Sequence, residues 1–178
     1  MTDFNNDSLD ALVRQYADRK LPPVASWHPE TTRDSDIRID SVGHWYYRGS
    51  RIERARMVAL FSTILRRESD NYYLITPHEK LRVVVEDVPF VVQLMEVTGR
   101  GTAQQLRFTD NTGNRFTAGS QNKLWIAHGD NESKPYCIVR DNLAALLSRP
   151  VYYQLADLIV RVNSQIGVYS DGVFFPLD

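Results

Sequence analysis

Residues 45–92 have the sequence WYYRGSRIERARMVALFSTILRRESDNYYLITPHEKLRVVVEDVPFVV, and this dense stretch determines which fold class the sequence predicts. It opens with aromatic residues, continues with apolar residues at helical spacing, and turns to strand-like runs after Asp70 and Asn71. A change of hydrophobic period from 3.6 to 2 is typical of a helix followed by antiparallel strands. The stretch therefore predicts a mixed α+β fold.

The middle of this stretch predicts a helix over residues 51–67. Ser50 and Glu53 have the spacing of a capping box, in which the two side chains bond backbone N–H groups at the start of a helix. Arg66 and Arg67 fall at the opposite end, where positive charge complements the helix dipole. The apolar stripe consists of Ile52, Met57, Leu60, Phe61, Ile64 and Leu65.

The residues that precede this stretch predict a helix, an extended segment and a hairpin. Ser8 is placed to cap a helix with apolar residues at positions 9, 12, 13 and 16. Residues 21–36 contain three prolines and show no regular period, which indicates an extended segment. Residues 37–40 and 44–47 are expected to pair as strands around a turn at residues 41–43.

The residues that follow predict strands, a second helix and a closing hairpin. Strand-like runs occupy residues 72–76, 81–85, 90–97, 106–109, 115–117, 124–127 and 136–139, with a strong turn signal at residues 111–113. Pro150 suits the first turn of a helix over residues 151–162. Asp171 and Gly172 predict a hairpin between residues 166–170 and 173–177.

The two predicted helices suggest a diverged internal duplication. At an offset of 95 residues (149 minus 54), Arg54 pairs with Arg149, and Arg66 with Arg161, along with several apolar positions. The alternative is that any two amphipathic helices match at apolar positions, and the paired arginines favour the duplication. We therefore expect two small subdomains, residues 1–80 and 81–178, each with mostly antiparallel strands packed on one helix.

Composition excludes several classes of protein. The 21 basic and 22 acidic residues give a net charge of -1, which removes the bulk attraction that drives binding to nucleic acids or anionic membranes. No apolar run approaches the roughly 20 residues of a membrane span, and the polar start lacks the pattern of a signal peptide. We expect a cytoplasmic protein with no membrane partner, in which Cys137 is a small buried hydrophobe.

No catalytic pattern is present in the sequence. The four histidines are widely spaced and form no metal-binding motif. Ser50 precedes a predicted helix, but the G-x-S-x-G motif of a nucleophile elbow is absent and a capping role suffices. We predict no catalytic residues, no metal site and no cofactor.

Several charged and aromatic residues are candidates for ligand binding. Arg51 and Arg54 fall in the predicted first helical turn, where a cation is disfavoured by about 0.3–1 kcal/mol unless an anion offsets it. That anion is either a bound phosphate or carboxylate, or the side chain of Glu86 or Asp87. An internal salt bridge is the preferred interpretation for Arg54, and both interpretations stay open for Arg48 and Arg51.

The aromatic residues and the following turn extend this set. Trp45 and Tyr47 share one face of a predicted strand, which is either part of the core or a stacking wall beside Arg48. Pro77 is explained by a turn at the end of a strand. Glu79 and Lys80 are explained less well by that turn, so they join the candidates.

The stretch resembles the uncharacterised bacterial family called domain of unknown function 1285 (DUF1285). The resemblance extends to the segments VEDVPF, PYCIVR and Leu-Ala-Ala further along the chain. The individual residues that carry it are Trp45, Gly49, Ser50, Ile52, Arg54, Met57, Val58, Leu60, Phe61, Thr76, Pro77, Glu79 and Lys80. It implies a two-part α+β fold with an internal duplication, and a C-terminal part superficially similar to pleckstrin-homology barrels. It also implies a ligand site, suited to a nucleotide-like molecule, where the parts meet. It implies no established activity.

We expect a non-catalytic ligand-sensing or adaptor protein of bacterial signalling that binds a nucleotide-like anionic ligand between its two subdomains. The alternative is a protein–protein interaction module that uses the same aromatic and basic surface. An enzyme with an unfamiliar site is the weakest of the three. The predicted ligand-binding residues are Trp45, Tyr47, Arg48, Arg51, Arg54, Glu79 and Lys80.

Overall fold

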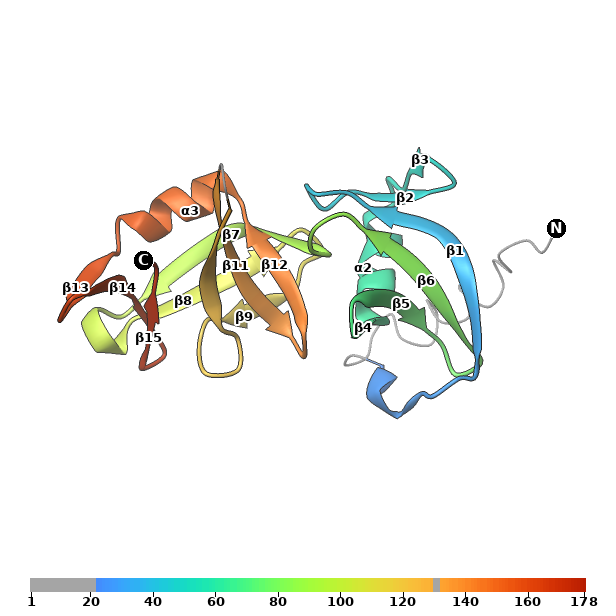
Figure 1. Ribbon diagram of the computed structural model, residues 1–178, viewed down its shortest axis with the longest axis horizontal. Helices are drawn as coiled ribbons and strands as arrows, with labels where there is room; N and C mark the ends of the chain where they lie inside the picture. Colours follow the sequence, from blue (N-terminus) through green and yellow to red (C-terminus); the bar gives the residue numbers. More distant parts are fainter. Residues whose placement is uncertain (1–21, 130–131) are drawn as a thin grey trace. The chain divides into compact units, whose positions relative to one another are not determined.

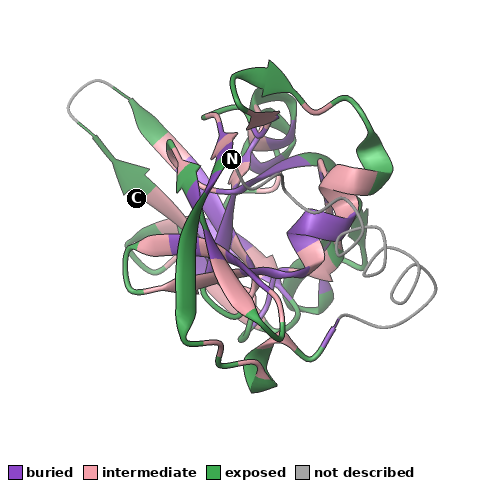
Figure 2. Cartoon of the chain, turned by 90° about the vertical axis from the view of Figure 1, so that its right-hand side faces the viewer, coloured by how far each residue is buried: buried purple, intermediate pink, exposed green. Residues whose placement is uncertain are grey.

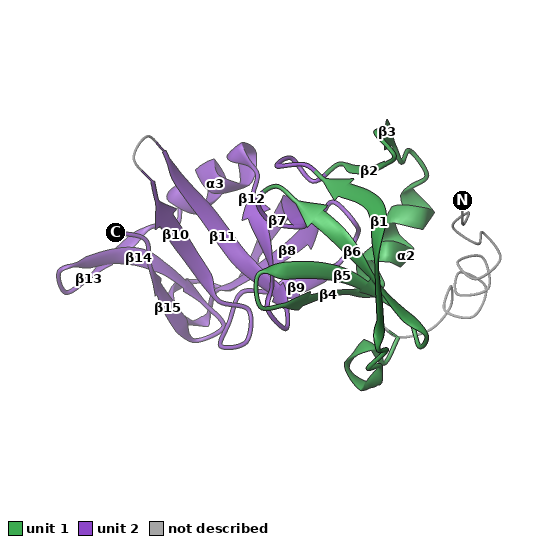
Figure 3. Ribbon diagram, turned by 45° about the vertical axis from the view of Figure 1, so that its right-hand side comes forward, with its two compact units in different colours: residues 1–39, 44–86 green, residues 40–43, 87–178 purple. Residues whose placement is uncertain are grey.

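The computed structural model describes residues 22–129 and 132–178, which form two compact α+β units (Figures 1 and 3). Of these residues, 22–39 and 44–86 belong to the N-terminal unit, and 40–43 and 87–178 to the C-terminal unit. The boundary expected at residue 80 falls within a strand, β6 (Glu79–Val85), which pairs with two strands of the N-terminal unit. The helix expected near residues 9–16 lies outside the described residues.

The N-terminal unit is a six-stranded sheet with one helix, α2 (Ala55–Thr63), on one face. The strand order is β3-β2-β1-β6-β5-β4, and every pair is antiparallel except β1 and β6. A short 3-10 helix, η1 (Val24–Ser26), precedes the sheet. The other strands are β1 (Thr31–Ile39), β2 (Trp45–Tyr47), β3 (Ser50–Arg51), β4 (Leu65–Glu68) and β5 (Asn71–Ile75).

The predicted hairpin between residues 37 and 47 is confirmed. Ile37 pairs with Tyr47 and Ile39 with Trp45, so the apolar residues of both strands point to the side that packs on α2. Gly43 closes the turn with φ of 82°, a conformation that favours glycine. The extended segment predicted for residues 21–36 is already a strand from Thr31 onwards, because β1 pairs in parallel with β6.

The capping box predicted at the start of the helix is wrong. Ser50 and Arg51 pair with β2, and the N–H of Ile52 donates to the carbonyl of Trp45 at 2.8 Å, so the chain is still extended there. The helix begins at Ala55 after Arg54, with no side-chain cap. Pairing with β2 satisfies the backbone groups that a capped helix start would otherwise have used.

The helix also ends earlier than predicted. Residues 65–68 form β4, which pairs with β5, and the N–H of Ile75 donates to the carbonyl of Ile64 at 2.9 Å. Arg66 and Arg67 therefore lie in a strand and have no role at a helix C-terminus. Apolar residues at positions 60, 61, 64 and 65 satisfy a helical stripe and a helix-to-strand junction equally well, and tertiary pairing decides between them.

The core of the N-terminal unit lies between α2 and the sheet, where buried residues are purple in Figure 2. Phe61 of α2 contacts Trp45 of β2 with 6.1 Å between ring centroids. The other large buried side chains are Ile37, Ile39, Leu60, Ile64, Leu65, Tyr72, Leu74, Ile75, Leu81 and Val83.

The C-terminal unit contains a six-stranded sheet, a three-stranded sheet and one helix, α3 (Arg149–Ala156). The larger sheet has the order β10-β11-β12-β7-β8-β9, and only β12 and β7 are parallel. Its strands are β7 (Phe90–Thr98), β8 (Gln105–Asp110), β9 (Arg115–Thr117), β10 (Leu124–His128), β11 (Ser133–Arg140) and β12 (Leu143–Leu147). The smaller sheet contains β13 (Val160–Val162), β14 (Gln165–Ser170) and β15 (Val173–Pro176). A 3-10 helix, η2 (Gly101–Ala103), links β7 to β8.

Most predicted elements of this unit are confirmed, with two corrections. Pro150 does lie in the first turn of α3, but the helix ends at Ala156 because Val160–Val162 pairs with β14 as strand β13. Strand β12 was not predicted, because its LAALL run is mostly buried and shows no alternation. The closing hairpin is confirmed, with φ of 50° at Asp171 and 74° at Gly172. None of the helices in the described residues has the length and hydropathy of a membrane span.

Candidate functional site

Trp45 is a core residue and cannot stack on a ligand in this fold. It is 1% exposed, and its strand neighbours Tyr46 and Tyr47 are half-buried. Alternation along β2 directs Trp45 toward α2, and its ring packs on Phe61. Of the two interpretations of this face, the core interpretation is the correct one for Trp45.

Arg48 is held by groups of its own unit. Its Nε lies 3.3 Å from Oδ2 of Asp36, and its guanidinium lies 5.2 Å from the ring centroid of Tyr47. The backbone N–H of Arg48 also donates to the carbonyl of Asp36 at 3.0 Å. Both charged side chains are more than half exposed, so the ion pair orients Arg48 and adds little stability.

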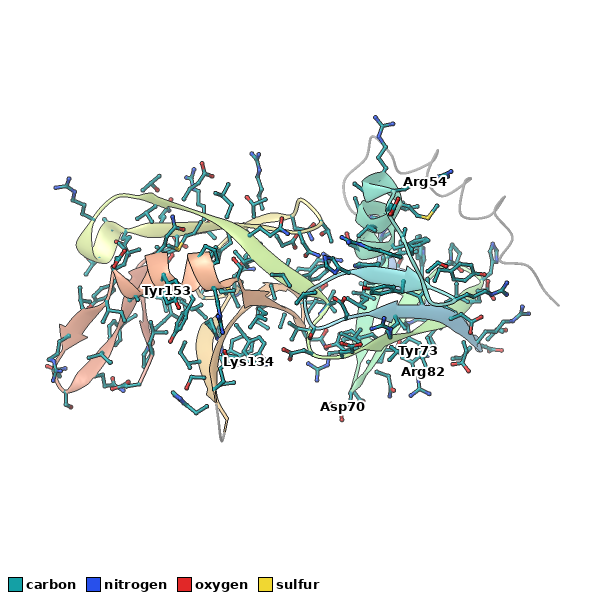
Figure 4. The ribbon with its side chains drawn as sticks, turned by 90° about the horizontal axis from the view of Figure 1, so that it is seen from above. Arg54, Asp70, Tyr73, Arg82, Lys134 and Tyr153 are labelled. Carbon is teal, nitrogen blue, oxygen red and sulfur yellow. The ribbon has the colours of Figure 1, made fainter. Side chains whose placement is uncertain are left out.

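The internal salt bridge preferred for Arg54 is wrong. Glu86 pairs with Arg38, and Asp87 accepts a hydrogen bond from Tyr136 and pairs with Lys134 at 3.6 Å. Arg54 is exposed at the start of α2, as Figure 4 shows, and makes no ion pair with any described carboxylate.

Arg51 is exposed too, but it lies on β3 opposite Tyr46. It also makes no ion pair with a carboxylate in the described ranges. Arg51 and Arg54 were predicted to share the first turn of a helix. Instead, Arg51 lies on β3 and Arg54 lies at the N-cap position of α2.

Glu79 and Lys80 are adjacent on β6, so they point to opposite faces of the sheet. Glu79 pairs with Arg33 at 3.6 Å. Lys80 pairs with Glu68 at 2.8 Å, and its Nζ lies 5.2 Å from the ring centroid of Tyr73. Lys80 thus belongs to the sheet face that α2 does not cover.

We call the side of the N-terminal sheet that faces away from α2 the open face. Cross-strand register places Arg66, Tyr73 and Arg82 in one row, and Tyr46, Arg38 and Val84 in another. Tyr73 and Arg82 are labelled together in Figure 4. The open face is made of Arg38, Tyr46, Arg51, Arg66, Glu68, Tyr73, Lys80, Arg82 and Val84.

Only Arg51 and Lys80 of this set were predicted from the sequence. The alternation of residues 80, 82 and 84, and of residues 71 and 73, was the signal for the rest. This alternation is a weaker signal than the concentration of aromatic and basic residues at positions 45–54. The open face could be assembled only once the order of the strands was known.

Glu68 is the centre of a charged network at one end of the open face. Its carboxylate accepts hydrogen bonds from Arg66 and, at 2.8 Å, from Lys80. Arg66 also donates to the carbonyls of Val24 at 3.1 Å and Trp27 at 2.8 Å, which ties the segment around η1 to β4. The hydrogen bond from Lys80 is the main cause that lowers the pKa of Glu68, followed by Arg66, against an opposing effect of burial.

Replacing Glu68 by glutamine should make stability less dependent on pH. A carboxyl whose folded pKa is lowered contributes stability above its ordinary value of 4.5, and that contribution is lost as the pH falls through the folded pKa. Wild type should therefore be more stable than Glu68→Gln at pH 7, and the difference should shrink below pH 4.5. Urea unfolding between pH 7 and a pH below 4.5 measures this difference in the free energy of unfolding. The matched control is Asp70→Asn, which changes an almost fully exposed carboxylate beside Arg67. An equal difference at all pH values would contradict the assignment.

The other end of the open face is aromatic and basic. The guanidinium of Arg38 lies 4.2 Å from the ring centroid of Tyr46 and pairs with Glu86. Val84, opposite Arg38 in the register, is 58% exposed. Arg82 donates to Asn71 at 3.1 Å. A cation thus lies over the ring of Tyr46 next to an exposed apolar residue.

Two buried titratable groups of the C-terminal unit have raised pKa values. Cys137 is fully buried, as predicted, and burial raises the pKa of its thiol far above its ordinary value. Tyr136 is also buried, and burial followed by its hydrogen bond to Asp87 raises its pKa to about 12. Both groups are held in their neutral forms at neutral pH.

Comparisons with known proteins agree with the division into two units. Residues 22–88 match the N-terminal domain of the domain of unknown function DUF1285, and residues 89–177 match the C-terminal domain of the same family. A search of the curated proteins gives no match.

Two solved structures are similar to this chain. A DUF1285 family protein from Silicibacter pomeroyi DSS-3 is 41% identical with a TM-score of 0.87, over 95% of this chain and 93% of that one. A DUF1285 family protein from Shewanella baltica OS155 is 27% identical with a TM-score of 0.55, over 68% of this chain and 90% of that one. With both domain matches and these two structures, the chain belongs to the DUF1285 family.

Proposed function

We propose that this chain is a non-catalytic adaptor of bacterial signal transduction, and that it docks a protein partner on the open face. The observation that carries the proposal is the composition of that face. It combines Tyr46 and Tyr73, each with a cation over its ring, and the exposed Val84. Tyrosine and arginine dominate the hot spots of protein interfaces, which supports a docking role.

The ion pairs of the open face favour binding because they orient the cations before a partner arrives. Arg38 is fixed by Glu86 and Tyr46, and Lys80 by Glu68 and Tyr73. Side chains that are already ordered lose less conformational entropy on association. The cytoplasm, the compartment favoured by the sequence, is where we place this function.

A photo-crosslinking amino acid at position 84 tests the proposal in cells of the native host. Val84 and Val42 are both 58% exposed, so position 42, in the β1–β2 turn, is a matched control. We expect one discrete protein adduct from position 84 and none from position 42. Arg82→Glu should abolish the adduct through charge reversal on the face, and Arg161→Glu on β13 should not. Adducts of equal yield from both positions, or an adduct that survives Arg82→Glu, would contradict docking at this face.

Ligand sensing is the second candidate, supported by the start of α2. This helix has no side-chain cap and no acidic residue in its first turn, and Arg54 beside it is exposed. Uncapped N–H groups and an arginine fork together suit the phosphate of a nucleotide-like anion.

We also propose that the two units are diverged copies of one ancestral unit. In each, a helix is followed by a two-stranded hairpin, α2–β4–β5 and α3–β13–β14. Each hairpin turn begins with a residue of positive φ, 52° at Ser69 and 55° at Asn163. The likeness of the C-terminal unit to pleckstrin-homology barrels has weaker support, from a six-stranded sheet accompanied by one helix.

A further inference from the structure

The tripeptide Arg-Phe-Thr occurs twice in the C-terminal unit, once on each arm of the β8–β9 hairpin. Residues 107–109 lie on β8 and residues 115–117 on β9. Because the strands are antiparallel, Arg107 pairs with Thr117, Phe108 with Phe116, and Thr109 with Arg115. The repeat therefore places a threonine opposite each arginine.

The two faces of this hairpin have different roles. Phe108 is 1% exposed, and its ring lies 5.7 Å from that of Phe116. The four polar residues alternate with these rings and point to the other side of the sheet. Directly opposite residues on such a face are about 5 Å apart and diagonal ones about 7–8 Å. The four polar side chains thus lie at the corners of a small square. The two arginines occupy one diagonal and the two threonines the other.

The hairpin is rigid because its turn is closed by a buried carboxylate. Asp110 is 3% exposed and accepts hydrogen bonds from the backbone N–H groups of Thr112 at 2.8 Å and Asn114 at 3.0 Å. It also accepts one from the Asn114 side chain at 2.8 Å, and Gly113 has φ of 90°. This network fixes the register, so the square of polar side chains exists before any ligand binds.

A surface hollow of about 260 Å³ lies over the square. All four corner residues line it, together with Glu96 of β7 and the two phenylalanines. Neither arginine forms an ion pair with a described carboxylate, although Glu96 lies opposite Arg107 in the register. Arg107 donates only a long hydrogen bond, 3.3 Å, to Gln105. Two arginines and one glutamate leave the hollow with a net positive charge.

We infer that this hollow binds the phosphoryl group of a small soluble phosphate monoester. Two guanidinium groups match a dianion and donate in the fork geometry that suits phosphate oxygens. The threonine hydroxyls supply donors at the remaining corners. The volume exceeds that of a phosphoryl group alone, so part of the attached molecule also fits. This site is in the C-terminal unit and does not depend on docking at the open face.

Equilibrium dialysis of the full chain against inorganic phosphate and glycerol 3-phosphate tests the site. We expect saturable binding with Kd of about 1 mM or tighter for glycerol 3-phosphate. Loss of one charge-assisted contact in Arg107→Ala or Arg115→Ala should weaken binding by about tenfold or more. Arg115→Lys, which keeps the charge without the fork, should fall between wild type and Arg115→Ala.

The threonines and Glu96 give independent readouts. Thr109→Val should weaken binding about threefold through loss of one hydroxyl, and Thr109→Ser should not. Glu96→Gln should tighten binding, because it removes a like charge from the hollow. Arg161→Ala removes an exposed arginine elsewhere in the unit and should change Kd less than twofold. Unchanged melting temperatures will show that the variants stay folded.

Vesicles that contain phosphatidic acid distinguish a lipid headgroup from a soluble phosphate monoester. We expect the chain to bind glycerol 3-phosphate and not to sediment with the vesicles. Sedimentation that depends on Arg115 would overturn the assignment to a soluble ligand. Equal weakening in Arg161→Ala and Arg115→Ala, or no saturable binding of either phosphate compound up to about 10 mM, would overturn the site itself.

Discussion

Replacing Trp45 by alanine should lower the free energy of unfolding of the N-terminal unit by about 3–5 kcal/mol, the usual cost of truncating a buried aromatic side chain. Trp45 is 1% exposed and packs against Phe61 of α2. Its removal leaves a cavity between helix and sheet that rigid neighbours cannot fill. Hydrogen exchange measured by mass spectrometry should show faster exchange in β1, β2 and α2, which contact Trp45, and unchanged exchange in the C-terminal unit.

Two variants serve as controls for this prediction. Tyr46→Ala changes the next residue on β2, which is half-buried on the open face, and should cost far less. Trp45→Phe keeps a ring and removes a buried indole N–H for which the described residues provide no acceptor, so it should recover most of the stability. Equal losses in Trp45→Ala and Tyr46→Ala would contradict the placement of Trp45 in the core.

Replacing Gly167 by alanine should destabilise the three-stranded sheet by about 3 kcal/mol, the upper part of the range for overpacking. An added Cβ would lie 2.2 Å from the carbonyl oxygen of Phe175 and 2.7 Å from the ring of Phe174. The nearest atom is backbone on the paired strand β15, so it cannot move without breaking the ladder. Thermal unfolding and hydrogen exchange in β14 and β15 measure the effect.

Gly172→Ala, in the turn of the same hairpin, separates crowding from backbone conformation. Gly172 has φ of 74°, and an added Cβ there meets nothing within 4 Å. Its replacement should cost only the penalty of a left-handed conformation, about 1 kcal/mol. A loss as large as that of Gly167→Ala would show that crowding against β15 is not the cause.

Much of the fold follows from local patterns. The hairpins between residues 37 and 47 and between residues 166 and 177 were predicted from alternation and turn residues, and both are present. These signals are local. A residue that favours positive φ forms a turn, and successive side chains of a strand point to opposite faces, whatever the rest of the fold is. The mixed α+β class was predicted from the same change of period.

The ends of both helices were not predictable in this way. Leu65 and Val162 continue the helical apolar stripes, yet each lies in a strand that pairs with a following one. An apolar residue at such a junction is buried equally well in either conformation, so the sequence pattern alone does not choose.

The candidate site was predicted in part. Arg51 and Lys80 lie on the open face, while Trp45 is in the core and Arg54 is an exposed residue directly before α2. Tyr73 and Arg82 were not predicted, yet they are cross-strand partners in the middle of that face.

The sequence by itself determined the fold class, the positions of the turns, the alternation of buried and exposed residues and the burial of Cys137. Only the tertiary structure decided where α2 and α3 end, which aromatic residues are buried, and which side chains share the open face and the β8–β9 hollow. The reason is physical. The hydrophobic period and the conformation of a turn depend on residues that are neighbours in the sequence. Strand order and register instead bring together residues such as Arg38 and Val84, which are distant in the chain.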